Sequence, residues 1–420
     1  MHVLMLSDVY FPRINGVSTS IATFRESLAL QDIRCTLVVP EYGGAGTGTV
    51  PATSTVDIVR VPAWTVPLDP EDRLMRSSAL ARALGGIDPQ GVDLVHIQTP
   101  FRAHHAGVQF ARRHGLCVIE TYHTHFEEYF HHYLPWLPRS LLRGAARVIS
   151  RRQCNAVDAV ISPSPGMRDV LLGYGVERPI EVLPTGLDLS LFAAGDGQRF
   201  RRERNIAADR PVLVVVSRVA HEKNIDQLID VVDRVRRDVP DVLLVIAGEG
   251  PAQAHLQQLV ARRDLGGHVM FVGYLERRGP LQDCYRAGDL FVFASRSETQ
   301  GLVLLEALAL GVPVVALAEL GTREIVLPER GAVAASGDTE EFAAVVTRLL
   351  RDRAQRERMA REGQAFAREW ATDAIAPRLR EIYEAALARA SGRATGTRAA
   401  TTTPITARSA HGTSPGEHRT

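Results

Sequence analysis

Residues 211–224 read Pro-Val-Leu-Val-Val-Val-Ser-Arg-Val-Ala-His-Glu-Lys-Asn. The apolar part of this stretch is short and rich in β-branched residues, which is typical of a strand buried on both faces of a parallel sheet. The polar residues that follow lie at the start of a helix-length amphipathic pattern. A buried strand followed at once by a loop and a helix indicates a doubly wound α/β sheet.

The same alternation recurs on both sides of this stretch. Upstream, we expect buried strands at residues 3–6, 35–39, 94–97, 118–121 and 159–162, and helices at 17–30, 102–114 and 139–154. Downstream, we expect strands at residues 211–216, 242–247, 269–272, 290–293 and 314–316. The pattern predicts an α/β protein with two doubly wound, Rossmann-like parallel-sheet domains that face each other across a cleft.

Changes in composition along the chain suggest the domain boundaries. We expect an N-terminal domain over residues 1–190 and a C-terminal domain over 191–370, joined by a glycine- and proline-containing connection at 184–210. Helices are expected at 339–352, 354–370 and 375–390, and the last of them, about 371–390, should complete the N-terminal domain. Residues 391–420 are rich in threonine and almost lack large apolar side chains, so we expect a disordered tail.

Length and composition exclude several classes of protein. A chain of 420 residues with 45% hydrophobic and 23% charged residues is ordinary globular protein with more than one domain. With a formal net charge of only +1, the protein as a whole does not attract the phosphates of a nucleic acid, so no nucleic-acid partner is expected.

The four cysteines and the apolar runs point to the cytoplasm. The cysteines lie far apart without a CxxC pair, which argues against both a zinc framework and a disulfide scaffold. The first residues lack the basic region of a signal peptide. The longest apolar run, 301–318, contains Glu306, Gly311 and Pro313, so we interpret it as a helix followed by a strand.

Lys223 is the only lysine in the chain, against 48 arginines. It lies with Arg218 in the loop after a buried strand and at a helix start, where two cations and the positive end of a helix dipole converge. This arrangement predicts a site for an oxyanion such as a diphosphate, because a compact ammonium and a planar guanidinium bind it in complementary ways. The alternative is that a single lysine falls here without a role.

Two further loops that follow strands carry candidate ligand-binding residues, and a third carries two histidines. Asn15-Gly16 precedes a helix whose free N–H groups favour an anion, and the alternative is a tight turn. Glu298 and Glu306 lie eight residues apart, just over two helical turns, so both can face the cleft. The alternative for Glu306 is burial beside a charged partner.

His123 and His125 follow the strand at 118–121. A metal cluster is conceivable, but their i, i+2 spacing does not match a helical ligand pair, and no cysteine accompanies them. No Asp-x-Asp occurs in the sequence. We therefore expect no metal ligands, and charge neutralisation of a diphosphate by Arg218 and Lys223 instead.

Four motifs together resemble the retaining family-four glycosyltransferases of GT-B fold over about residues 1–390. They are Asn15-Gly16-Val17, the segment 218–223, Gly248-Glu249-Gly250-Pro251, and Glu298 with Glu306. The resemblance implies that Arg218 and Lys223 hold the diphosphate of a nucleotide sugar, while Glu298 holds the sugar and Glu306 the ribose. It further implies an active-site role for His123, with His125 a second candidate. The remaining donor-binding positions that it implies are Gly16, Gly248, Gly301 and Leu302.

The family resemblance also implies the reaction. A sugar leaves its nucleotide diphosphate, such as UDP-glucose or GDP-mannose, with retention of configuration, and the acceptor attacks from the leaving-group face. No covalent nucleophile and no cofactor are then required. Catalysis depends on stabilising the charge that develops on the departing diphosphate.

Residues 136–152 suggest where the acceptor comes from. Arg139, Arg143, Arg147 and Arg151 recur at i, i+4 and form one cationic ridge, and Trp136 belongs to an aromatic cluster just upstream. This pattern favours docking on an anionic lipid surface, and the alternative is a solvated helix face. Because residues 122–133 and 298–305 resemble diacylglycerol glucosyltransferases, we expect a lipid acceptor and peripheral association with the inner face of the membrane.

Other functions stay open at this point. The nearest alternative is a GDP-mannose-dependent mannosyltransferase that acts on a phosphoinositide or an oligosaccharide. A nucleotide-sugar epimerase and a non-catalytic nucleotide-sugar binder belong to different functional classes. A dinucleotide oxidoreductase is disfavoured, because no GxGxxG follows either first strand.

Overall fold

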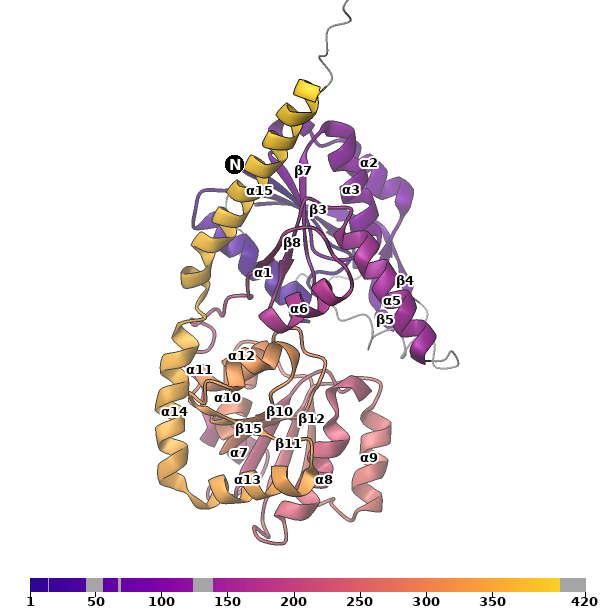
Figure 1. The fold of residues 1–420 in the computed structure, drawn as a ribbon. Helices are drawn as coiled ribbons and strands as arrows, with labels where there is room; N and C mark the ends of the chain where they lie inside the picture. The colour runs from indigo at the N-terminus through magenta and orange to yellow at the C-terminus, as the bar shows by residue number, and fades with distance from the viewer. Residues whose placement is uncertain (14, 43–55, 67–68, 124–138, 401–420) are drawn as a thin grey trace, which may run out of the picture.

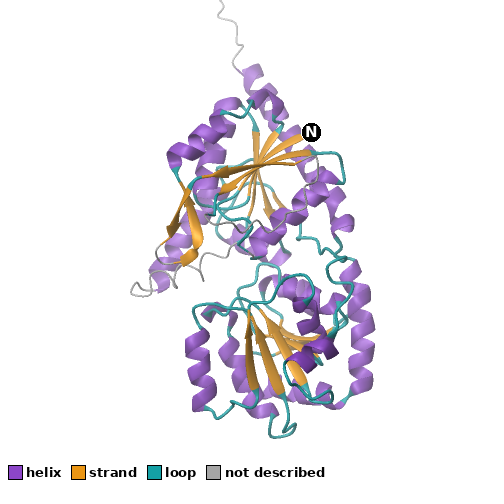
Figure 2. Ribbon diagram, turned by 180° about the vertical axis from the view of Figure 1, so that it is seen from behind, coloured by secondary structure: helices purple, strands orange, loops and turns teal. Residues whose placement is uncertain are grey.

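The computed structural model describes residues 1–13, 15–42, 56–66, 69–123 and 139–400. These residues form two α/β domains, one above the other in Figure 1, with the N-terminus and the C-terminal helix both in the upper domain. Figure 2 shows the two sheets from behind, each with helices beside it.

The N-terminal domain is built on a seven-stranded parallel sheet with the strand order β3-β2-β1-β6-β7-β8-β9. Its strands are β1 (His2–Leu6), β2 (Arg34–Pro40), β3 (Val56–Val61), β6 (Leu94–Ile97), β7 (Cys117–Thr121), β8 (Ala159–Ser162) and β9 (Ile180–Val182). An antiparallel hairpin, β4 (Ala63–Val66) and β5 (Asp69–Met75), follows β3. The helices are α1 (Gly16–Ala29), α2 (Ser77–Gly85), η1 (Pro89–Gly91), α3 (Arg102–His114), α5 (Arg139–Cys154) and α6 (Pro165–Gly173).

Strand β1 shows why this sheet is covered on both faces. Val3 and Met5 belong to one hydrophobic core, and Leu4 and Leu6 belong to another. Successive side chains of a strand point to opposite faces, so a continuous apolar run requires apolar layers above and below. Each layer of helices therefore has its own core.

The C-terminal domain repeats the plan with a six-stranded parallel sheet in the order β12-β11-β10-β13-β14-β15. Its strands are β10 (Val212–Val216), β11 (Leu243–Ala247), β12 (Val269–Gly273), β13 (Leu290–Phe293), β14 (Val314–Leu317) and β15 (Ala332–Ala335). Its helices are α7 (Gly197–Glu203), η2 (His221–Lys223), α8 (Ile225–Val235), α9 (Gln253–Arg262), α10 (Pro280–Ala287), α11 (Leu302–Ala309), η3 (Leu320–Thr322), α12 (Arg323–Val326), α13 (Thr339–Arg351) and α14 (Arg353–Arg368). The predicted fold class, two doubly wound parallel-sheet domains, is confirmed.

The chain crosses between the domains twice, and the two crossings lie side by side. Leu187 forms an isolated parallel bridge with Ala371: its N–H donates to the carbonyl of Trp370 (2.7 Å), and Thr372 N–H donates to the carbonyl of Leu187 (3.1 Å). After the second crossing, helix α15 (Thr372–Ala400) packs against α1. Its buried side chains, which join the core of the N-terminal domain, are Ile375, Leu379, Ile382, Tyr383 and Ala386.

The sequence predicted the central strands and the edge strand β12, but missed the other three edge strands. All ten predicted strands are present, whereas β3, β9 and β15, at or near sheet edges, and the hairpin β4–β5 were not anticipated. The run 301–318 divides into α11 and β14 as expected. Among the described residues, no helix is long and apolar enough to cross a membrane.

One expectation about the tail is wrong in part. Residues 391–400 were expected to be disordered, but α15 continues to Ala400. Alanine and arginine, which recur in this stretch, are strong helix formers, so a helix that is already nucleated extends through them. Residues 401–420 lie outside the described residues.

Candidate active site

A cleft of about 880 Å³ lies between the domains and is lined by residues of both. In each sheet the strand order reverses at one position: between β1 and β6 in the first domain, and between β10 and β13 in the second. At such a reversal, or switch point, the loops after the two strands run in opposite directions and leave a crevice at the carboxyl ends of the strands. Every donor-binding and catalytic residue that the sequence predicted lines this one cleft: Gly16, His123, Arg218, Lys223, Gly248, Glu298, Gly301, Leu302 and Glu306.

At the C-terminal switch point, Lys223 and Glu298 form an ion pair. Lys223 ends η2 after β10, Glu298 lies in the loop after β13, and the Lys223 Nζ donates to Glu298 Oε1 at 2.6 Å. The two side chains are 20% and 18% exposed, so the pair is accessible from the cleft. Burial lowers the pKa of Lys223, but the Glu298 carboxylate more than offsets this, and the net shift is upward. Lys223 is therefore a cation at neutral pH.

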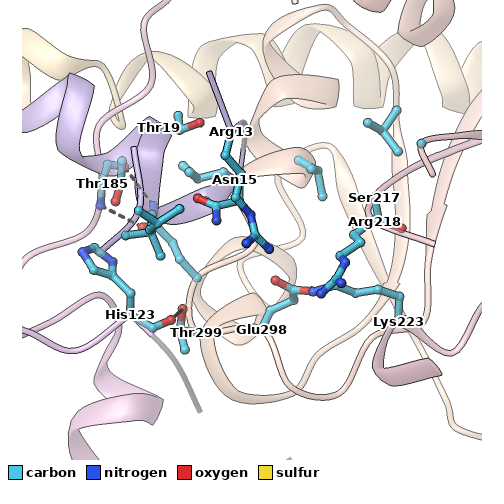
Figure 3. A pocket seen from close by; sticks show the side chains of 18 of the residues that line it. Arg13, Asn15, Thr19, His123, Thr185, Ser217, Arg218, Lys223, Glu298 and Thr299 are labelled. Atoms are coloured by element: carbon cyan, nitrogen blue, oxygen red, sulfur yellow. Dashed lines mark hydrogen bonds and ion pairs between the residues drawn. The ribbon is translucent and has the colours of Figure 1, made fainter. Parts of the chain in front are cut away.

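Arg218 lies beside this pair, and the three side chains gather at one point of the cleft (Figure 3). The loop that carries Arg218 runs close to the loop after β11. Gly248 has φ +132°, and a Cβ on it would lie 1.9 Å from the carbonyl oxygen of Ser217. Gly248 thus has a structural role in the close approach of these loops, in addition to its place on the cleft wall.

Glu306, in α11, is only 3% exposed and has partners on both carboxylate oxygens. Tyr285 Oη donates to Oε2 at 2.7 Å, and Arg277 Nη2 donates to Oε1 at 3.2 Å. Burial and the charge of Glu306 raise the pKa of Tyr285 well above its ordinary value. The alternative of paired burial is therefore realised, and burial of Glu306 no longer requires a ligand. Its predicted contact with a ribose stays a prediction, because each carboxylate oxygen accepts more than one hydrogen bond.

The loop that carries Glu298 is tied to the first domain. The Gln300 side chain accepts from Thr185 N–H (2.8 Å) and donates to the carbonyl of Thr185 (2.9 Å), and both residues are buried. Thr185 Oγ1 in turn donates to Ser20 Oγ in α1 at 2.8 Å. Gly301, with φ +93°, precedes Leu302, the first residue of α11. The bridge through Gln300 links the start of α11 to α1 across the cleft.

Helix α1 presents its N-terminus to the cleft. Asn15 is the N-cap, with extended backbone, and its side chain accepts from Ser18 N–H at 2.8 Å. Asn15-Gly16 is therefore a helix start and not the tight turn of the alternative interpretation. A Cβ on Gly16 would meet no atom within 4 Å, so the backbone here stands open to a ligand.

His123 follows β7 and faces the cleft from the first domain (Figure 3). Its Nε2 donates to Gln98 Oε1 at 2.8 Å, and its carbonyl oxygen accepts from Thr299 Oγ1 across the cleft at 3.1 Å. Burial lowers the pKa of His123 to about 4, so the ring is neutral at pH 7. With Nε2 protonated, Nδ1 has a free lone pair and acts as an acceptor. The candidate second histidine, His125, lies outside the described residues.

The predicted docking helix is present as α5 (Arg139–Cys154), while Trp136 lies outside the described residues. Arg143, Arg147 and Arg151 are exposed. Arg147 lies over the ring of Tyr174 at 5.8 Å, and Arg151 Nη2 is 3.9 Å from Glu177 Oε1. The exposed side of α5 also carries Leu141 and Val148, at 60% and 50% exposure.

Sequence reasoning missed several residues of the cleft. Asp8 lies two residues after β1, in a loop where ligand-binding side chains are expected, but no motif in the sequence singled it out. Gln98 and Gln300 were missed because their partners lie 25 and 115 residues away, a distance at which no local pattern signals a contact. Within the described parts of the chain, no three His, Cys, Asp or Glu side chains group as they would to hold a metal ion. Independence of metal stays a prediction.

Comparison with known proteins identifies the family. Residues 14–191 match the model described as Glycosyltransferase Family 4, and residues 196–366 match that of Glycosyl transferases group 1. The chain is 30% identical over 331 residues to the alpha-monoglucosyldiacylglycerol synthase of Streptococcus pneumoniae, which covers 75% of this chain and 71% of the relative. It is 28% identical over 381 residues to a GDP-mannose-dependent alpha-mannosyltransferase of Mycobacterium tuberculosis, covering 88% of this chain and 93% of the relative.

A solved structure supports the same fold. Sucrose-phosphate synthase from Thermosynechococcus elongatus superposes with a TM-score of 0.75 at 20% identity, over 92% of this chain and 99% of that chain. The matched family models, the pneumococcal relative and the arrangement of two facing sheets agree with the resemblance found in the motifs. This chain belongs to the family-four, group 1 glycosyltransferases and has their GT-B fold.

Proposed function

We propose that the protein transfers a hexose from a nucleotide diphosphate sugar to the hydroxyl group of diacylglycerol, with retention of configuration. The observation that carries the proposal is the Lys223–Glu298 ion pair beside Arg218, in a cleft that also receives the N-terminus of α1. Two cations and free helix N–H groups around one space suit a diphosphate, and a carboxylate beside them suits sugar hydroxyls.

Each residue then has a part in the reaction. Arg218 and Lys223 neutralise the charge that develops on the departing diphosphate, for which a single preorganised donor contributes about 2.7 to 4 kcal/mol. Glu298 accepts hydrogen bonds from the transferred sugar and also holds Lys223 in place. Neutral His123 offers Nδ1 to a hydroxyl near the reacting carbon. No metal ion is assigned a role, and we expect activity to be unchanged by excess EDTA.

The acceptor is assigned from the pneumococcal relative, which is named for the synthesis of monoglucosyldiacylglycerol. The exposed side of α5 supports a lipid acceptor, because it presents Leu141 and Val148 together with Arg143, Arg147 and Arg151. Apolar side chains flanked by cations suit the interface of an anionic membrane, where each cation near the surface contributes about 1 kcal/mol. The protein would then act as a peripheral protein at the inner face of the membrane.

A mannosyltransferase is the second candidate. It is favoured by the mycobacterial relative, which is named as a GDP-mannose-dependent enzyme and of which this chain covers 93%. The two candidates differ in donor base, sugar and acceptor, while the cation cluster at the diphosphate is common to both.

One experiment separates these functions. The purified protein is incubated with UDP-glucose or GDP-mannose and with vesicles that contain dioleoylglycerol or phosphatidylinositol, and the lipids are analysed by mass spectrometry. We expect a hexosyl-dioleoylglycerol from UDP-glucose. Transfer only from GDP-mannose and only to phosphatidylinositol would contradict the proposal in favour of the mannosyltransferase. Conversion of the nucleotide sugar without transfer would indicate an epimerase, and binding without turnover a sensor.

Membrane docking is tested by sedimentation with phosphatidylglycerol vesicles. A variant with Arg139, Arg143, Arg147 and Arg151 changed to serine should lose most of its binding. The matched control changes four exposed arginines of α14 in the other domain, namely Arg353, Arg358, Arg361 and Arg368. Equal sedimentation of both variants and the unaltered protein would remove α5 as the docking element.

A further inference from the structure

Asp8 occupies the N-terminal switch point. It follows β1 by two residues, lines the same cleft as Lys223 and Glu298, and is only 6% exposed. It comes from the first domain, whereas Arg218, Lys223 and Glu298 come from the second. Asp8 therefore lies on the opposite wall of the cleft from Arg218 and Lys223, a wall that also carries Arg13 and Arg73.

One oxygen of the Asp8 carboxylate is fully engaged and the other is not. Oδ2 accepts from Thr99 Oγ1 at 2.8 Å and from Ala103 N–H at 3.0 Å, in the first turn of α3. The Asp8 N–H also donates to Thr99 Oγ1 at 2.7 Å. Oδ1 has no hydrogen-bond partner among the described residues. These bonds fix the carboxylate against the loop after β6 and the first turn of α3, and leave one acceptor position to be filled.

A structural role at the start of α3 explains only one oxygen of this carboxylate. Holding that helix end requires one acceptor oxygen, which an asparagine or a serine supplies without charge. The second oxygen of Asp8 adds a buried acceptor that costs free energy unless a donor meets it. Burial raises the pKa of Asp8 to about 6, even though the backbone donors and the nearby Arg102 cation act in the opposite direction. The charged form is thus present at neutral pH at a cost in stability.

We propose that Asp8 is an acceptor-binding residue, whose Oδ1 accepts a hydrogen bond from the glycerol hydroxyl of diacylglycerol. This inference rests on the proposed function, since it names a contact within the same site. A hydroxyl supplies the donor that Oδ1 lacks, whereas a phosphate at this position would be repelled by the carboxylate. At its own position, the Asp8 carboxylate therefore favours an alcohol over a phosphorylated head group.

The test is the Asp8→Asn variant. Its side-chain oxygen still accepts from Thr99 and Ala103, and its amide donor replaces the unpartnered acceptor. Initial rates are measured with UDP-glucose and with 1,2-dioleoylglycerol in phosphatidylglycerol vesicles, and hydrolysis of UDP-glucose is measured without lipid. We expect the KM for dioleoylglycerol to rise at least tenfold, while the KM for UDP-glucose and its hydrolysis change less than twofold. Asp57→Asn, an exposed position on β3 that pairs with Arg34, is the matched control.

Two results would overturn the inference. The first is an unchanged KM for dioleoylglycerol. The second is an equal loss of activity towards dioleoylglycerol and UDP-glucose together with a lower Tm, which would mark Asp8 as a structural residue of α3. Asp8→Ser, which also keeps one acceptor oxygen, replaces the first variant if that does not fold. If the unaltered protein transfers nothing to dioleoylglycerol, the proposed function fails and the assigned hydroxyl with it. An active protein with an unaffected variant contradicts only the role of Asp8.

Discussion

The two switch points of the molecule have the same topology but differ in the polar contacts that join their loops. In the C-terminal domain, the loops after β10 and β13 are joined by an ion pair, Lys223 with Glu298, that is partly exposed to the cleft. In the N-terminal domain, the loops after β1 and β6 are joined by a buried hydrogen bond between Thr99 and Asp8. The nearby His123 is held neutral by burial.

This difference indicates how one fold serves two substrates. Charged groups with residual exposure can attract a diphosphate and exchange hydrogen bonds with it. The buried Asp8 carboxylate is instead fixed in orientation by its hydrogen bonds, which suits the positioning of a neutral alcohol. We infer that Arg218 and Lys223, with the N-terminus of α1, serve the donor, and that Asp8 serves the acceptor.

The largest expected effect concerns the C-terminal switch point. Lys223→Ala should lower kcat at least a hundredfold, because it removes a cation from the departing diphosphate, a contribution of about 2.7 to 4 kcal/mol. Steady-state kinetics and circular dichroism of the variant check this. Near-normal turnover of a folded Lys223→Ala protein would count against the site.

The second-largest expected effect is on the free energy of unfolding and concerns Asp8, at the N-terminal switch point. The pKa of Asp8 is raised from 3.8 to about 6 in the folded protein, so unfolding is favoured as the pH rises from about 4 to 6, where the buried carboxyl loses its proton. Asp8→Asn removes this cost. Relative to the unaltered protein, its free energy of unfolding should increase over that range and level off above pH 6, by about 2 to 3 kcal/mol. Urea denaturation at pH 4.5, 6 and 8 measures the difference, and a constant difference at all three would be inconsistent with a raised pKa.

A smaller effect is expected at the link between the two switch points. Gln300→Ala leaves the buried N–H and carbonyl of Thr185 without partners, at about 1 to 3 kcal/mol. The loop of Glu298 is then no longer tied to α1, and kcat/KM should fall about tenfold. Gln364→Ala is the control, because the Gln364 side chain makes one long bond (3.4 Å) within the C-terminal domain. If both variants retain full kcat/KM, the bridge does not position the loop.

The smallest effect concerns the hydrogen bonds that connect Tyr383 to His123 through His96 and Gln98. Tyr383 Oη in α15 is 2.7 Å from His96 Nδ1, and His96 lies beside Gln98, the partner of His123. Tyr383→Phe should cost about 1 kcal/mol of stability, the value of one buried hydrogen bond, and change kcat less than threefold. Thermal unfolding together with kinetics checks this, and a loss of kcat tenfold or larger would mean that α15 takes part in the chemistry.

Much of the donor-binding part of the site in the C-terminal domain could be predicted from the sequence, because its signals are local. The strand, the cationic loop and the helix of residues 211–235 are contiguous, and Glu298 and Glu306 lie on one helix and the loop before it. Continuous apolar runs identified the central strands of both sheets. Three of the four edge strands of the two main sheets escaped detection because their apolar runs are weak or interrupted: β15 is Ala-Val-Ala-Ala, and β3 contains Asp57 and Arg60. The fourth, β12, has a continuous apolar run and was predicted.

What could not be predicted depends on contacts between distant parts of the chain. Glu306 meets Arg277 and Tyr285, and nothing in the spacing of these residues reveals that they converge. The same holds for Gln300 and Thr185, which lie in different domains. Asp8 could have been identified as a candidate from its place after β1, but its unpartnered oxygen is visible only once β6 and α3 are placed beside it.

The separate roles of Lys223 in donor binding and Asp8 in acceptor binding are tested most directly by nucleotide affinity. Isothermal titration of UDP into the unaltered protein, Lys223→Ala and Asp8→Asn compares the two switch points in one assay, without lipid. The account predicts at least a tenfold weaker Kd for Lys223→Ala and a Kd within twofold of the unaltered protein for Asp8→Asn. Equal UDP affinity of the unaltered protein and Lys223→Ala, or a large loss of UDP affinity in Asp8→Asn, would contradict the account.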